Sequence, residues 1–180
     1  RREIRRPLLL TLRMGEEGGG LSVKFREVDR LGLFRAALAE VNGVDIELAA
    51  VEINRHVVFE AHTRGRFVIL SSHNFKRTPS NVVLAGFVRK AKRLGGDILK
   101  VAAKPLGRKD VTRLMDFCAK TPFRRRVFIA MGPLGVQSRM DGFRHGSLLT
   151  YGHVRRPLAP GQWPVHRLAA AVKQSPPASL

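Results

Sequence analysis

Short apolar segments of strand length alternate with longer helical patterns along most of this chain, and this alternation constrains the fold more than any single motif does. Six segments have the composition of buried strands: residues 7–13, 44–50, 66–72, 97–103, 127–131 and 148–154. Strands that alternate with helices predict a parallel sheet joined by right-handed crossovers. The sequence therefore predicts an α/β protein.

The length and composition indicate one domain with a substantial core. The chain has 180 residues, of which 44% are apolar, as expected of a globular domain of this size. In the helical stretch 23–40 and just beyond it, apolar residues recur every three or four positions, as in a core-facing stripe: Phe25, Val28, Leu31, Phe34, Leu38 and Val41. We predict one domain over residues 1–174 and a Ser/Pro-rich tail over residues 175–180.

Several classes of protein are excluded by what the sequence lacks. No apolar run approaches the roughly 20 residues that a membrane-spanning helix needs, and the apolar run at residues 8–10 is too short for the core of a signal peptide. We therefore predict a cytoplasmic protein without a membrane partner. Cys118 is the only cysteine, which excludes an intrachain disulfide and a thiolate metal cluster. Its apolar helical surroundings predict a core residue.

The charge balance is strongly basic, with 33 Lys and Arg against 14 Asp and Glu, a net charge of +19. Such a balance raises the question of a nucleic-acid partner. The basic residues form small scattered groups, however, and one Trp and one Tyr supply little aromatic surface on which bases could stack. We therefore predict an arginine-rich surface rather than a nucleic-acid interface. The same field would favour an anionic small-molecule substrate.

Two reactive side chains lie near the ends of successive predicted strands. His73 follows Val68-Ile69-Leu70-Ser71-Ser72, and Lys100 lies within Asp97-Ile98-Leu99-Lys100-Val101-Ala102. In barrels of alternating strands and helices, catalytic groups collect at the carboxyl ends of the strands. A proton shuttle beside an amine nucleophile suits imine chemistry on a ketone.

Each of these residues has an ordinary alternative. A lysine in a strand is usually a solvated residue at the strand end, but the apolar neighbours of Lys100 make it hard to solvate. Lys104 lies four residues further on and shares its face, although its place before Pro105 predicts the mouth of a barrel. The other histidines lack metal-ligand spacing and are interpreted as surface or packing residues: His56, His62, His145, His153 and His166.

Taken together, several ordered motifs resemble type I 3-dehydroquinate dehydratase, the Schiff-base enzyme of the shikimate pathway. The resemblance covers about residues 4–172. It is carried by these groups: Thr11-Leu12-Arg13 with Glu17-Gly18-Gly19, Asp45-Ile46-Glu47-Leu48, Ser72-His73-Asn74-Phe75 with Thr78-Pro79, Lys100 five residues before Pro105, Met131-Gly132 with Gly135, Ser138-Arg139 and Gly146-Ser147, and Ala159-Pro160-Gly161-Gln162.

This resemblance implies a particular α/β fold, the (β/α)8 barrel of the TIM type. A closed barrel of this kind has eight strands, and six would leave two edges with unpaired backbone groups. We therefore expect that the first two strand–helix units of the barrel are missing from this chain and that six are present.

The resemblance also implies a reaction, the dehydration of 3-dehydroquinate to 3-dehydroshikimate by a lyase that uses no metal or organic cofactor. Lys100 would form an imine with the C3 ketone. His73 would remove the C2 proton and later protonate the departing C1 hydroxyl, oriented by Glu17. The remaining implied contacts hold the substrate: Arg13, Arg139, Gln162 and Met131.

The chain departs from the family pattern at several positions. A glutamate and an arginine on the family's first two strands have no counterpart here, and Leu158 stands where a substrate-binding serine is expected. Arg13 and Arg139 could be surface charges, and Glu17 a loop carboxylate. Two other functions stay open at this point: a different aldolase-like Schiff-base barrel enzyme, and an inactive basic nucleic-acid-binding remnant of the family. A homodimer is compatible with the sequence.

Overall fold

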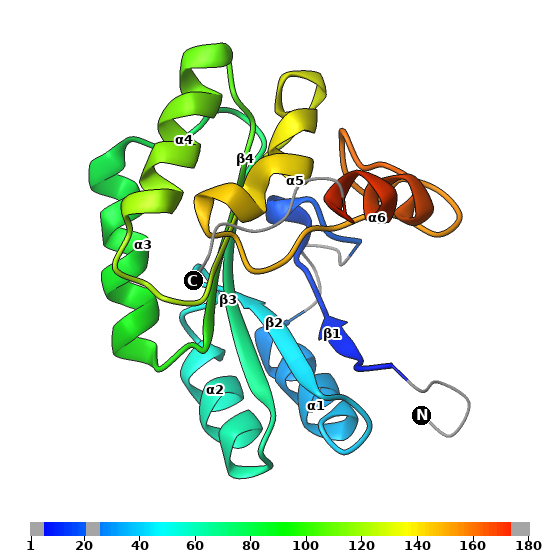
Figure 1. Ribbon diagram of the computed structural model, residues 1–180. Helices are drawn as coiled ribbons and strands as arrows, with labels where there is room; N and C mark the ends of the chain where they lie inside the picture. The colour runs from blue at the N-terminus through cyan, green and yellow to red at the C-terminus, as the bar shows by residue number, and fades with distance from the viewer. Residues whose placement is uncertain (1–5, 21–25, 174–180) are drawn as a thin grey trace. The chain divides into compact units, whose positions relative to one another are not determined.

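The computed structural model describes residues 6–20 and 26–173, which form the alternating pattern of strands and helices shown in Figure 1. Five strands form one sheet in the order of the chain: β1 Leu9–Thr11, β2 Gly43–Glu47, β3 Phe67–Asn74, β4 Ile98–Ala103 and β5 Arg126–Ala130. The α-helices are α1 Glu27–Ala37, α2 Asn54–Thr63, α3 Asn81–Leu94, α4 Arg108–Lys120, α5 Val136–Asp141 and α6 Val165–Lys173. Short 3-10 helices cover Gly15–Glu17 (η1), Pro133–Gly135 (η2) and Gly142–His145 (η3).

Five of the six predicted strands are confirmed, and the α/β class with them. The strand predicted at residues 148–154 is wrong, since this part of the described chain contains only isolated bridges at Ser147 and His153. The reason lies on the free edge of β5. There the backbone N–H of Phe128 donates to the Ser147 hydroxyl (3.0 Å) and that of Ala130 donates to the Ser138 hydroxyl (3.0 Å). Two serines thus take the places that a sixth strand would have bonded.

The apolar stripe predicted along the first helix is confirmed for most of its members. Leu31, Phe34, Leu38 and Val41 are buried, whereas Val28 is 60% exposed near the start of α1. Phe25 and the predicted tail over residues 175–180 lie outside the described residues. The helix itself is shorter than its pattern, because α1 begins at Glu27 and ends at Ala37.

The residues cluster into two compact units. The first comprises Arg1–Ser72 and Phe87–Leu99. In it β1, β2 and β3 run parallel, with Thr11 opposite Asp45 and Glu47 opposite Ser71. Helices α1 and α2 pack on each other, and α2 packs on β2 (Figure 1). Every residue of β2 is buried, including two carboxylates.

The second unit comprises His73–Gly86 and Lys100–Leu180. Its strand segments are joined by backbone bonds: Lys104 N–H donates to Asn74 C=O (2.8 Å), and Met131 N–H donates to Ala103 C=O (2.8 Å). Helices α4 and α5 both pack on β5. Because β4 is buried along its whole length, any polar side chain on it lies in an apolar environment.

Candidate active site

Lys100 lies in the interior of β4 and is almost fully buried. Its side chain is 6% exposed, and its neighbours Leu99 and Val101 are 0% and 1% exposed. The Nζ atom lies over the ring of Tyr151, 4.4 Å from the ring centroid. An aromatic face attracts a cation through its quadrupole, more strongly where water is excluded. The amine is therefore held in a fixed, dry position, as a nucleophile requires.

His73 lies near the end of β3, and the backbone pairing determines which way it points. Strands β2 and β3 show how a backbone bond relates to the pairing of residues. The Leu48 N–H donates to the Ser71 C=O (2.7 Å), and the residue opposite Ser71 is Glu47, one residue before Leu48. The bond from Lys104 to Asn74 therefore sets Ala102 opposite His73.

Nearer the start of β4 the Asp97 N–H donates to the Val68 C=O (3.0 Å), a register that differs by one residue. With regular pairing from Lys100 to Lys104, His73 and Lys100 lie on the same face of the sheet. Lys100 is two residues before Ala102, and alternate residues of a strand share a face. Along the strands the two levels differ by two residues, about 6.6 Å. One small molecule can therefore contact both groups. Lys104, the competing lysine, is exposed in the structure beyond the end of β4, so it lacks the apolar surroundings of Lys100.

Arg139 is a buried cation on the short helix α5. Its side chain is 3% exposed, and its guanidinium donates to the Pro160 carbonyl (3.0 Å) and the Tyr151 carbonyl (3.5 Å). Burial lowers the pKa of the Arg139 guanidinium from its ordinary value, because a charged group loses hydration there. Among the described residues, no carboxylate forms an ion pair with it.

The segment from Leu158 to Gln162 forms a tight turn beside the end of β5. The Gln162 side-chain oxygen accepts from the N–H groups of Leu158 (2.8 Å) and Ala159 (3.2 Å). Gly161 has φ +74°, and a Cβ there would lie 2.8 Å from the Gly132 carbonyl, so only glycine fits. The Leu158 side chain is 81% exposed. Gln162 therefore closes this turn, and Leu158 points to solvent.

Met131 follows β5 directly and is 3% exposed. Its N–H bond to Ala103 sets Ala130 opposite Ala103, so Ile129 lies opposite Ala102 on the face that carries Lys100. The second unit thus brings together four of the predicted site residues around β4 and β5 and places the fifth, Gln162, in the adjoining turn: His73, Lys100, Met131, Arg139 and Gln162.

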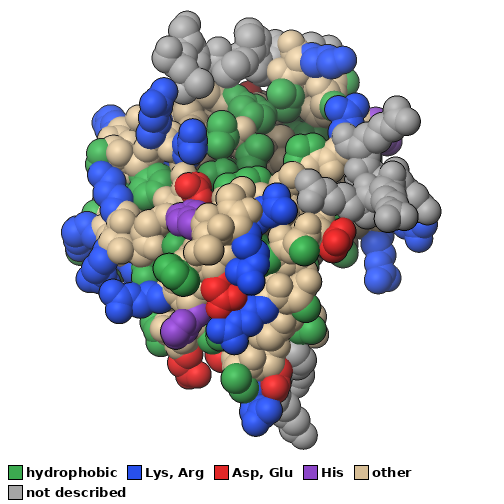
Figure 2. Space-filling view, turned by 90° about the horizontal axis from the view of Figure 1, so that it is seen from below, with side chains coloured by type: hydrophobic (Ala, Val, Ile, Leu, Met, Phe, Trp, Pro, Cys, Tyr) green, Lys and Arg blue, Asp and Glu red, His purple; other side chains and the backbone are tan. Residues whose placement is uncertain are grey.

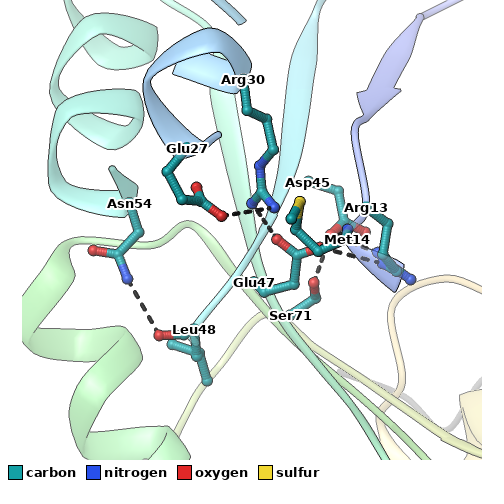
Figure 3. A network of polar contacts seen from close by, with 9 residues as sticks. All are labelled: Arg13, Met14, Glu27, Arg30, Asp45, Glu47, Leu48, Asn54 and Ser71. Atoms are coloured by element: carbon teal, nitrogen blue, oxygen red, sulfur yellow. Dashed lines mark hydrogen bonds and ion pairs between the residues drawn. The ribbon is translucent and has the colours of Figure 1, made fainter. Parts of the chain in front are cut away.

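Arg13 and Glu17 lie in the first unit, in the segment that follows β1. The Arg13 guanidinium donates to Asp45 (2.9 Å), and its Nε lies 3.8 Å from Glu47 (Figure 3). Ser71 also donates its hydroxyl to Asp45 (2.6 Å). Glu17 ends η1 and is half-buried. Arg13 is therefore held by buried carboxylates and is not a free surface charge.

Sequence reasoning missed several polar residues around these sites. Asp45 and Glu47 are buried and alternate with apolar residues along β2. This alternation predicts that both carboxylates lie on one face of the strand, and it was visible in the sequence. Tyr151 is the only tyrosine of the chain, and it contacts Lys100 through its ring and Arg139 through its carbonyl. Arg30 is fully buried on α1, and nothing in its sequence context distinguishes it from the many other arginines.

Two other properties of the described residues bear on function. No helix in residues 6–20 and 26–173 is long and apolar enough to cross a membrane. Over the same ranges, no group of three His, Cys, Asp or Glu side chains is placed to hold a metal ion. On the face drawn in Figure 2, lysine and arginine side chains are spread among acidic, histidine and apolar ones rather than gathered into one patch.

Comparisons with known proteins agree with one another. The sequence pattern of the type I 3-dehydroquinase family matches residues 1–176. The chain is 33% identical over 173 residues to 3-dehydroquinate dehydratase of Clostridium kluyveri, covering 93% of this chain and 68% of that protein. It is 37% identical over 167 residues to 3-dehydroquinate dehydratase of Methanosarcina barkeri, covering 88% and 68%.

Solved structures give the same result. The structure is similar to 3-dehydroquinate dehydratase of Geobacillus kaustophilus, with a TM-score of 0.87, 29% identity and coverage of 93% of this chain and 67% of that one. It is also similar to type I 3-dehydroquinate dehydratase of Clostridium difficile with covalently modified comenic acid, with a TM-score of 0.86, 30% identity and coverage of 93% and 68%. The predicted barrel-type fold is confirmed by these matches.

Proposed function

Because this chain belongs to the type I 3-dehydroquinase family, we propose that it is a hydro-lyase of the shikimate pathway that converts 3-dehydroquinate to 3-dehydroshikimate through an imine on Lys100. One observation carries the proposal. A buried lysine lies against an aromatic ring, and the strand that carries it is hydrogen-bonded at its end to the strand that carries His73. The proposed catalytic domain is the partial barrel of residues 1–174.

The reaction begins with the Lys100 amine in its uncharged form. Its nitrogen attacks the C3 carbonyl carbon, one proton is taken up from solvent, and the carbonyl oxygen leaves as water, which produces a protonated imine. This cation lies where the Tyr151 ring faces Nζ, so the aromatic face that stabilises the ammonium also stabilises the iminium. The iminium then accepts the electron pair released at C2.

His73 moves the proton in this proposal. Its imidazole takes the C2 proton, the electron pair flows into the iminium, and the resulting enamine expels the C1 hydroxyl. The His73 imidazolium returns the same proton to that hydroxyl, which leaves as water. Water then hydrolyses the protonated imine, which releases the proton taken up at the start and regenerates the Lys100 amine. The net change is the loss of one water from the substrate.

Arg139 is the proposed partner of the substrate carboxylate. A buried guanidinium bonded only to two backbone carbonyls retains N–H donors directed away from them. A planar guanidinium can donate two parallel hydrogen bonds to a carboxylate. Met131, Gln162 and Arg13 are proposed substrate contacts, and Glu17 is a proposed positioning group for the imidazole. For Gln162, substrate binding would require an exchange of the bonds that its oxygen now makes within the turn.

The experiment is a continuous absorbance assay with 3-dehydroquinate. Dehydration creates a conjugated enone carboxylate that absorbs in the near ultraviolet, whereas aldol cleavage of an oxo-acid does not. We expect turnover by the parent chain, no turnover by Lys100→Met, and unchanged turnover by the matched Lys104→Met variant. Turnover of other oxo-acids by cleavage would favour the aldolase-like alternative. Tight RNA binding that weakens steeply with salt, without turnover, would favour the nucleic-acid-binding alternative.

Three finer parts of the proposal rest on the sequence and the family. We propose that the enzyme works in the cytoplasm, that its chemistry uses only side chains of this chain, and that two copies associate. We also propose a small anionic substrate rather than a nucleic-acid partner; on the one face drawn in Figure 2, basic side chains are spread among other types.

A further inference from the structure

Arg30 is a buried cation that the proposed reaction does not use. It lies on α1 and is 0% exposed. Its guanidinium forms an ion pair with Glu47 at the end of β2 and another with Glu27 (3.3 Å) on its own helix. Removing a guanidinium from water is costly unless its partners are well placed. A residue of this kind therefore has a function in the fold or at a site.

Glu47 links Arg30 to the segment that carries two proposed site residues. One carboxylate oxygen pairs with Arg30, and the other accepts the backbone N–H of Met14 (3.2 Å) and lies 3.8 Å from Arg13 Nε. Figure 3 shows the Glu47 side chain between Arg30 on one side and the Arg13–Met14 segment on the other. Glu47 therefore joins helix α1 to the end of β1.

Fixing Met14 also fixes the turn that contains Glu17. The Met14 carbonyl accepts the N–H groups of Glu17 (3.2 Å) and Gly19 (3.0 Å). A Cβ on Gly19 would lie 1.9 Å from the Arg13 carbonyl oxygen, so the turn packs directly on the Arg13 backbone. The segment from Arg13 to Gly19 is thus bonded to itself through Met14, and Glu47 binds it there.

The charges explain why this arrangement needs Arg30. Arg13 and Arg30 together balance Asp45 and Glu47, and all four lie buried or nearly so. Without Arg30, the buried Glu47 carboxylate would have Arg13 as its remaining strong partner within the network drawn in Figure 3. Coulomb attraction in such a dry environment is strong, so Arg13 would turn from Asp45 toward Glu47.

We propose that Arg30 and Glu47 are positioning residues, which set the orientation of Arg13 and of the Glu17 turn for substrate binding. The inference rests on the proposed function, in which Arg13 and Glu17 belong to the substrate site. It assigns an effect on KM to a buried helix residue that is not itself a proposed substrate contact.

The test compares three variants of the full chain in the dehydration assay. Arg30→Met breaks the pair, and we expect KM for 3-dehydroquinate to rise at least about tenfold. The double variant Arg30→Met/Glu47→Leu replaces the ion pair with apolar side chains, which restores the thermal midpoint toward that of the parent. The double variant lacks the Glu47 carboxylate that accepts the Met14 N–H, so we expect its KM to stay raised. Arg35→Met is the matched control, because Arg35 lies on the same helix in a surface pair with Glu60 (2.7 Å).

KM and the thermal midpoint together distinguish a positioning role of Arg30 and Glu47 from a purely stabilising one. A raised KM in the double variant, with a parent-like midpoint and an unchanged KM in Arg35→Met, supports the inference. A parent-like KM in the double variant overturns it. Where Arg30→Met does not fold, the double variant alone decides. A parent chain that does not turn over 3-dehydroquinate contradicts the proposed function, whereas parent turnover with unaltered KM in all variants contradicts only this inference.

Discussion

Buried positive charge has different partners in the two compact units: carboxylates in the first and backbone carbonyls in the second. The first unit holds 16 basic and 11 acidic residues, and its half-buried Arg13 and fully buried Arg30 contact buried carboxylates. The second unit holds 17 basic and 3 acidic residues, and its buried Arg139 contacts backbone carbonyls. Net charges of +5 and +14 result, which together make the +19 of the chain.

The acids of the second unit are engaged elsewhere or exposed. Asp110 pairs with Arg113 (3.0 Å), Asp141 accepts from Gln137 (2.6 Å), and Asp116 is exposed on α4. A buried cation without an acidic partner destabilises a fold, and proteins retain such groups chiefly at functional sites. The comparison therefore separates charges that stabilise the first unit from a charge in the second unit that we propose binds an anionic ligand.

The largest effect is expected at Lys100. Lys100→Met keeps the length and removes the amine, so we expect kcat to fall by at least about 10⁴-fold. The free energy of unfolding should stay unchanged or rise, because a thioether suits the apolar interior of β4 better than an ammonium does. Steady-state kinetics and urea unfolding measure the two quantities. A variant that keeps activity would break the assignment.

The next effect is on stability and belongs to the first unit. Arg30→Met leaves the Glu47 carboxylate buried without its main partner, and we expect the free energy of unfolding to fall by about 3–5 kcal/mol. Urea unfolding followed by circular dichroism measures it, with Arg35→Met as the control, expected to change by less than about 1 kcal/mol. Equal changes in both variants would contradict the distinction between the buried and the surface pair.

Arg139→Gln should lower activity more than stability, the reverse of what we expect for Arg30→Met. We expect kcat/KM to fall by about 10- to 100-fold, because a charge-assisted hydrogen bond to the substrate carboxylate is worth about 1.5–3 kcal/mol. The free energy of unfolding should fall by no more than about 1 kcal/mol, since the desolvation cost of the cation disappears along with its bonds to two carbonyls. A loss of stability as large as that of Arg30→Met would remove the contrast between the units.

The smallest effect concerns Asp110, the acid of the second unit that pairs with Arg113. The Leu106 N–H first and Arg113 second lower the pKa of the Asp110 carboxyl below its ordinary value of 3.8. A carboxyl with a lowered folded-state pKa stabilises the fold above the unfolded-state value and loses that contribution as pH falls through the folded-state value. Asp110→Asn should therefore cost about 0.5–1 kcal/mol at pH 7 and almost nothing near pH 2. Thermal melts at the two pH values measure it, with Asp116→Asn as the control.

Much of the fold follows from the sequence because alternating apolar segments have one physical solution, a sheet covered by helices. Five strands are correct for that reason. The strand predicted at residues 148–154 is wrong because its composition cannot reveal that Ser138 and Ser147 bond the edge of β5.

The two proposed catalytic residues could be predicted from the sequence, whereas the residues around them could not. His73 and Lys100 stand out as polar residues within or just after apolar segments, whereas the pairing between their strands is visible only in the structure. Arg30 and Glu47 are 17 residues apart and meet only because α1 packs beside β2. Tyr151 reaches Lys100 from 51 residues away in an irregular segment. Such contacts depend on tertiary packing, which no local pattern encodes.

The most direct measurement is reduction of the reaction mixture with borohydride, followed by peptide mapping by mass spectrometry. Hydride reduces an imine to a stable secondary amine, so the chain should gain the mass of the reduced adduct in the presence of 3-dehydroquinate. We predict that this mass lies on Lys100 and disappears in Lys100→Met. An unmodified chain, or an adduct confined to Lys104 or another lysine, would contradict it.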